Sequence, residues 1–93
     1  YITSYCPATG EPIAMVADAT KQDVNDACTA ARNAFNNGWA DMDSHKRADL
    51  MLKAASIMKR REKELAEYEA LDTGKPISET AGFDIPFSIY AFE

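Results

Sequence analysis

The sequence of 93 residues predicts a mostly α-helical fold with a β-hairpin at its N-terminal end. Two observations support this fold class. Runs of β-branched and aromatic residues flank a Pro- and Gly-containing turn in residues 1–17, which is the pattern of a hairpin. From residue 20 onward, apolar side chains recur at steps of three and four, which is the period of an amphipathic helix. The hydrophobic fraction of 46% is typical of a chain that folds around a core.

The hairpin is expected over residues 1–17. Its first strand is the run Tyr1–Tyr5 and its second is the apolar run Ile13–Val16. Pro7 presets its backbone angle for a turn, and Gly10 can adopt the positive φ that closes one. These residues therefore predict two short antiparallel strands.

The first helix is expected over residues 20–37. Thr20 followed by Asp23 has the spacing of a capping box, in which each residue satisfies a free backbone N–H at the start of a helix. The residues Asn36-Asn37-Gly38 favour a helix end, because Asn and Gly tolerate the left-handed conformation of a C-cap. The apolar positions that fall on one face of this helix are Val24, Ala27, Cys28, Ala31, Ala34 and Phe35.

The second helix is expected over residues 44–73, with a break near 60–62 because that length is unusual in a small domain. Gly74 and Pro76 then favour its end. A further helix is expected over 78–93. Pro86 lies inside it and lacks a backbone N–H, so we expect a kink or a restart near Asp84.

The charge and cysteine content exclude several classes of protein. A net charge of −5 argues against a nucleic-acid-binding protein, which would present a basic face to phosphates. No apolar run is long enough to cross a bilayer, and no secretory signal is visible. The two cysteines, Cys6 and Cys28, are too few for a disulfide framework. We therefore expect a cytoplasmic protein that binds neither nucleic acid nor membrane.

Few residues are candidates for chemistry. A cysteine nucleophile would need a histidine beside it, and His45 is the only one in the chain. Cys28 lies on the apolar face of the first helix, where a buried, inert thiol is the favoured interpretation; Cys6, beside Pro7, is interpreted as a turn residue. Asp84 stands between two apolar residues, where a carboxylate is costly unless it is paired. A cap, an ion pair or a hard-cation ligand would each explain it.

The two ends of the chain predict that it is part of a longer polypeptide. It begins at Tyr1 inside an expected strand, and it stops in the apolar run Phe87–Phe92 without a helix-terminating residue. Exposed apolar surface of this kind promotes association, which makes it an unusual terminus for a complete domain.

The order of several segments resembles the NAD(P)-dependent aldehyde dehydrogenase superfamily, with betaine-aldehyde-like and broad-specificity members closest. The resemblance covers nearly the whole chain. The segments that carry it are Cys6-Pro7-Ala8-Thr9-Gly10-Glu11, the alanine-rich helix 27–35 followed by Trp39, the start Arg47-Ala48-Asp49-Leu50 of the second helix, Asp72-Thr73-Gly74-Lys75-Pro76 and Phe83-Asp84-Ile85-Pro86.

This resemblance implies an α/β parent enzyme with a Rossmann-type cofactor domain, which oxidises an aldehyde to a carboxylic acid with NAD or NADP. Residues 1–93 would be the N-terminal part of the cofactor-binding domain, without the catalytic and oligomerisation domains. They would hold no catalytic and no cofactor-binding residue, and the whole protein would be a homodimer or homotetramer.

The resemblance also implies one site in this segment, a structural potassium or sodium ion. The positions that match its ligands are Ser4, Tyr5 and Asp84, the first two through backbone oxygens. Cys6 stands where the family usually has asparagine, and the pair Ser4-Tyr5 replaces a Thr followed by Ile or Val. These departures concern the loop that would shape the site.

Two alternative functions stay open on the sequence. The chain could be a stand-alone helical interaction module derived from this family, or a small enzyme that uses Cys28 and His45. We also expect the isolated segment to be of marginal stability, because burial and chain entropy nearly cancel at this size.

Overall fold

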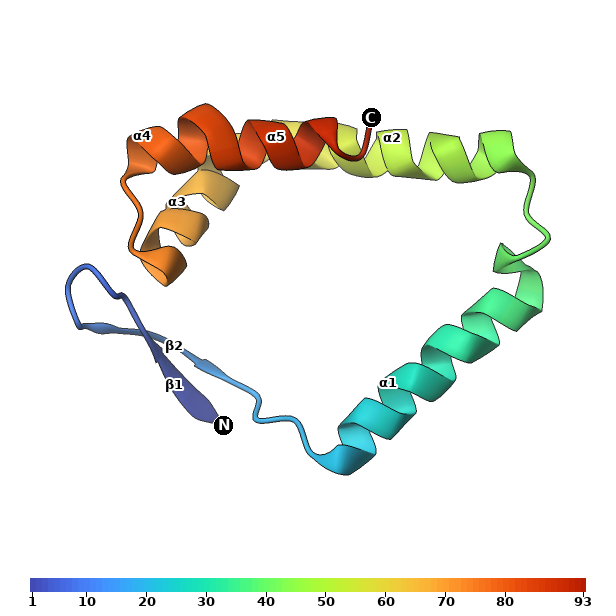
Figure 1. Cartoon of the computed structure of the whole chain (residues 1–93), viewed down its shortest axis with the longest axis horizontal. Coiled ribbons are helices and arrows are strands. Elements are labelled where there is room, and N and C mark those ends of the chain that lie inside the picture. Colours follow the sequence, from blue (N-terminus) through green and yellow to red (C-terminus); the bar gives the residue numbers. More distant parts are fainter.

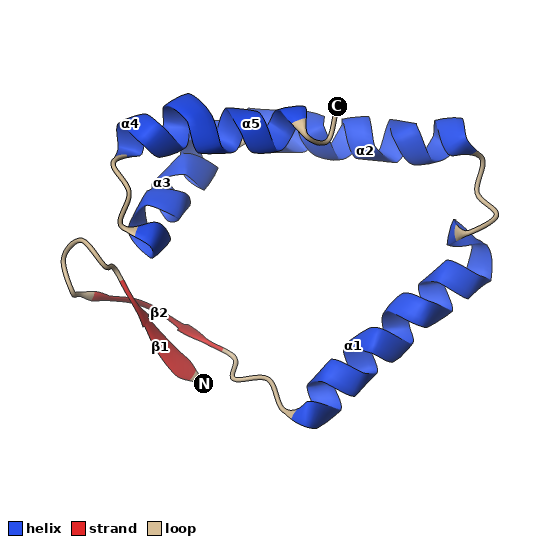
Figure 2. Cartoon of the chain, viewed as in Figure 1, coloured by secondary structure: helices blue, strands red, loops and turns tan.

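The computed structural model describes residues 1–93 as a β-hairpin followed by helices that bend around an open ring (Figure 1). Helices make up most of the chain, and the only strands are the two at the N-terminal end (Figure 2). The predicted fold class, mostly α with an N-terminal hairpin, is confirmed.

The hairpin pairs β1 (Ile2–Tyr5) with β2 (Pro12–Val16) in antiparallel register, with Ile2 opposite Val16. The register shifts between Ser4 and Tyr5, where the strand bulges. Gly10 has a φ of 76°, and its N–H donates to the Cys6 carbonyl at 2.7 Å. The positive φ explains the glycine, because other residues adopt it only at a cost.

Helix α1 spans Lys21–Ala34 and begins with the predicted capping box. The Asp23 N–H donates to Thr20 Oγ1 at 3.3 Å, and the Thr20 N–H donates to Asp23 Oδ2 at 2.7 Å. The helix was expected over 20–37, but the chain instead widens into a π-helical segment, η1 (Phe35–Trp39). Gly38, with a φ of 122°, supplies the backbone break within it.

The expected helix over 44–73 forms two helices, α2 (Ser44–Arg60) and α3 (Glu62–Thr73), with Arg61 between them. The Asp43 carboxylate caps α2 by accepting the N–H groups of His45 and Lys46. Arg61 has φ −108° and ψ 16°, outside the helical region, so the helix axis changes direction there. Gly74 ends α3 in the left-handed conformation that a C-cap favours.

The last part of the chain runs through α4 (Ile77–Glu79), η2 (Thr80–Asp84) and α5 (Ile85–Tyr90). It was expected over 78–93. Pro86 occupies the first turn of α5, where its missing N–H costs no hydrogen bond. The wider π-helical turn of η2 directly before it lets the helical path continue to Tyr90.

The core lies where α2, α3 and α5 meet, and it is small. Its buried apolar members are Ala55, Ala66, Ile85 and Ile89, with Met58 and Leu65 packed against them. Thr80 is fully buried beside this cluster, and its hydroxyl donates to the Ala66 carbonyl at 2.9 Å. The two alanines allow the helices to approach closely.

Outside this core the chain is open and flat, with extents of 47 × 34 × 15 Å. Its accessible surface is 7250 Å², whereas a folded protein of this mass exposes about 5300 Å². The radius of gyration is 17.0 Å, against about 12 Å for a compact domain of this length. Most of the apolar side chains are therefore not covered within these 93 residues. None of the helices is long and apolar enough to cross a membrane.

The close approach of the hairpin to the end of α3 explains why residue 74 is a glycine. Gly74 has a φ of 74°, and a Cβ there would lie 3.0 Å from Pro7 Cβ and 3.2 Å from the Ala8 nitrogen. Gly10 has nearly the same φ but has open space around its Cα. A substitution at Gly10 therefore measures the free-energy cost of the positive φ alone. A substitution at Gly74 adds the cost of the steric contact with the hairpin.

We predict that Gly74→Ala destabilises the protein more than Gly10→Ala does. Both changes place Cβ in a left-handed conformation, at a cost of about 1–2 kcal/mol. Gly74→Ala must also push the hairpin away, which adds roughly 1 kcal/mol or more. Denaturant unfolding of the two variants measures the difference. Equal losses of stability would show that the hairpin does not pack on α3.

Candidate cation site

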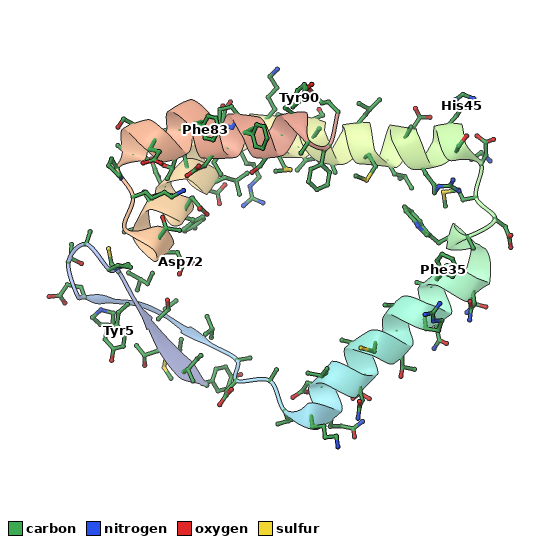
Figure 3. The ribbon with its side chains drawn as sticks, in the orientation of Figure 1. Tyr5, Phe35, His45, Asp72, Phe83 and Tyr90 are labelled. Carbon is green, nitrogen blue, oxygen red and sulfur yellow. The ribbon has the colours of Figure 1, made fainter.

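The expected cation site lies near the place where the hairpin approaches the C-terminal end of α3. Ser4 and Tyr5 are the last residues of β1, and the Ser4 hydroxyl donates to Asp72 Oδ1 at 3.3 Å. Figure 3 shows Tyr5 on the hairpin and Asp72 on the facing end of α3. Together with the Pro7–Gly74 contact, this hydrogen bond fixes the hairpin against α3.

Asp84, the third expected ligand, is part of an ion pair. Its Oδ2 lies 2.8 Å from Lys75 Nζ. The Asp84 side chain is only 18% exposed and the Lys75 side chain 40%. The hydrogen bond to Asp84 raises the pKa of Lys75, and the negative charges of Asp84, Glu79 and Glu69 add to this shift. The carboxylate thus already has a positive partner within the chain.

Ser4 and Tyr5 are expected to bind a cation through backbone oxygens, so the predicted site stays a prediction; the side chains of Ser4 and Asp84 have other partners. The Ser4 hydroxyl is directed to Asp72, and the Asp84 carboxylate is directed to Lys75. No hydrogen bond joins Asp84 to Ser4 or Tyr5, and no cluster of three or more His, Cys, Asp or Glu side chains could hold a metal ion. Lys75 Nζ occupies Oδ2 of Asp84, the oxygen for which a bound cation would compete with it.

The thiol and imidazole groups do not form a catalytic pair. Cys28 lies in α1 and His45 lies at the start of α2, and no hydrogen bond links them. Figure 3 shows His45 at the end of α2 that points away from α3. The prediction that Cys28 is buried is wrong for this chain, because its thiol is exposed. The physical reason is that α1 buries none of its residues against another element.

Cys6 is the buried cysteine, with 4% of its surface exposed. It opens the turn of the hairpin, as expected of a turn residue. Hydrogen bonds from the Thr9 hydroxyl and from the backbone N–H groups of Thr9 and Ala8 lower the pKa of the Cys6 thiol. No histidine lies in this turn to serve as a base.

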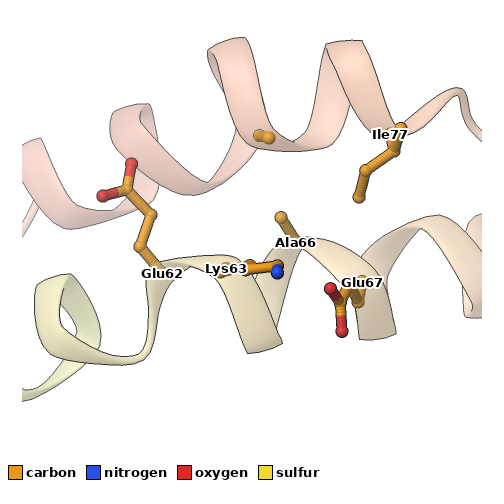
Figure 4. Close-up of a pocket in the computed structure, with 6 residues that line it drawn as sticks. Glu62, Lys63, Ala66, Glu67 and Ile77 are labelled. Atoms are coloured by element: carbon orange, nitrogen blue, oxygen red, sulfur yellow. The ribbon is translucent and has the colours of Figure 1, made fainter.

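A shallow pocket between α3 and the segment from α4 to η2 has mixed charge (Figure 4). The residues that line it are Glu62, Lys63, Ala66, Glu67, Ile77 and Ala81. It contains no thiol, hydroxyl or imidazole side chain. Its surroundings are those of a solvated groove between two helices.

Two residues that organise this region were not identified from the sequence. Lys75 is named only as a member of the segment Asp72-Thr73-Gly74-Lys75-Pro76 that carries the family resemblance, and Thr80 is not singled out. The spacing of nine residues between Lys75 and Asp84 spans a turn and a π-helical segment, so no helical period indicates the pair. An isolated acid between Phe83 and Ile85 was the only available signal, and it indicated a partner without naming it.

Comparison with known proteins decides the family. The aldehyde dehydrogenase family model matches residues 1–93, the whole of the chain. The chain belongs to the aldehyde dehydrogenase family.

Individual members of the family are similar over nearly the full chain. The betaine aldehyde dehydrogenase of Rhizobium etli is 46% identical over 92 residues, which are 99% of this chain and 19% of that protein. The mitochondrial benzaldehyde dehydrogenase of Antirrhinum majus is 39% identical over 87 residues, 92% of this chain and 16% of that protein. A solved aldehyde dehydrogenase from Bacillus cereus superposes with a TM-score of 0.93 and 38% identity, over 98% of this chain and 19% of that one.

The chain thus spans less than a fifth of the length of these aldehyde dehydrogenases. The high TM-score means that its open arrangement of hairpin and helices also exists within a much longer folded polypeptide. The relatives act on chemically different aldehydes according to their names, yet they match this segment at similar identity. The segment therefore does not distinguish between those substrates.

The Lys75–Asp84 pair leads to a prediction for the dependence of stability on pH. Because folding raises the pKa of Lys75, the pair stabilises the protein fully below the pKa of an unfolded lysine, about 10.4. The stabilisation is lost as the pH rises through the higher pKa of the folded state. We therefore expect Lys75→Met to lower the stability at pH 7–9 and to match the parent protein at strongly alkaline pH.

The measurement is the free energy of unfolding of Lys75→Met and of the parent protein, by denaturant, from pH 7 to strongly alkaline pH. Lys63→Met is the matched control, since no salt bridge involves Lys63. A difference between Lys75→Met and the parent that does not change with pH would contradict an ionic origin.

Proposed function

We propose that residues 1–93 belong to an NAD(P)-dependent aldehyde dehydrogenase that oxidises an aldehyde to a carboxylic acid. The observation that carries this proposal is the match of the whole chain to the family, together with the superposition at a TM-score of 0.93. The cytoplasmic location and the homodimer or homotetramer expected of the whole protein belong to this proposal.

Within that enzyme the segment supports the fold and supplies no catalytic or cofactor-binding residue. Its thiols support this role: Cys6 is enclosed in a turn, and Cys28 has no base beside it. Its three positive-φ glycines also support it, because Gly10, Gly38 and Gly74 each lie at a turn or at the end of a helix. The chemistry would come from residues outside 1–93.

The alternative of a stand-alone interaction module is favoured by one observation, the amount of apolar surface that is exposed. The stacked pair Phe83 and Phe87 has ring centroids 5.5 Å apart, and both side chains are more than half exposed. Such a surface could bind a partner protein. The native mass of the protein separates the two functions.

We predict that the native polypeptide has a mass several times the 10.2 kDa of this chain, and that it reduces NAD or NADP only when an aldehyde is present. The measurements are intact mass spectrometry of the protein from its natural source and the absorbance of the reduced nicotinamide. Residues 1–93 alone serve as the control and are expected to be inactive. A native mass near 10.2 kDa would favour the interaction module.

We further propose that a potassium or sodium ion and the Lys75 ammonium group are alternative partners of Asp84. The ion would take its other oxygens from the backbone of Ser4 and Tyr5. What supports this is the position of Lys75 Nζ, which places a single positive charge 2.8 Å from the carboxylate. Hard cations are bound by carboxylate and backbone carbonyl oxygens, the two kinds of ligand that this site would supply.

We predict that Lys75→Met makes the stability of the whole enzyme more dependent on potassium. Without the ammonium group, Asp84 loses its one salt-bridge partner within residues 1–93, and a bound ion would replace that positive charge. The measurement is the thermal midpoint in potassium chloride and in an equal concentration of tetramethylammonium chloride. Lys75→Met combined with Asp84→Asn should lose the effect, and a midpoint of Lys75→Met that ignores potassium would contradict the proposal.

A further inference from the structure

We draw no further inference here: the strongest candidate, the exposed aromatic patch formed by the stacked rings of Phe83 and Phe87 where η2 continues into α5, carries nothing, because nothing in the structure shows what covers it.

Discussion

The contact between the buried Thr80 hydroxyl and the Ala66 carbonyl is the interaction on which the packed half of this structure, from α2 to α5, depends. It joins residues 14 positions apart, from η2 to the middle of α3. Thr80 has no exposed surface, so its hydroxyl needs an acceptor. It lies 2.9 Å from the Ala66 carbonyl and 3.3 Å from the Ile77 carbonyl of its own turn, so the shorter contact is the one that depends on the approach of η2 to α3. Ala55 and Ala66 can then lie against Ile85 and Ile89 because no larger side chain separates the helices.

The hairpin and α1, which form the other half of the chain, make no such contact with the core, and this half is therefore open. The hairpin is connected to α3 through Ser4, Pro7 and Gly74, and α1 has no comparable connection to the core. Local signals still define α1, since the Thr20–Asp23 capping box and the regular helical hydrogen bonds need no tertiary partner. A helix whose apolar face is uncovered has its secondary structure specified locally and its place in the fold specified elsewhere.

Electrostatics in this segment serves mainly to stabilise structure. Asp23 and Asp43 cap helices, Glu64 pairs with Arg61 at the junction of α2 and α3, and Asp84 pairs with Lys75. Each of these four carboxylates accepts hydrogen bonds from N–H groups at the start of a helix or pairs with a positively charged side chain. The carboxylates that these contacts engage belong to helix starts and to ion pairs of the fold.

The sequence by itself determined the elements that depend on near neighbours. The hairpin turn at Pro7–Gly10, the capping box of α1 and the place of Pro86 in a first helical turn follow from local backbone preferences. The length of the second helical pattern predicted the break at Arg61, and the ordered motifs identified the family. Only the tertiary structure decided the partner of Asp84, the role of Thr80 and the exposure of Cys28. The physical reason is that periodicity tells which face of a helix is apolar, whereas the contacts that cover that face come from residues distant in the chain.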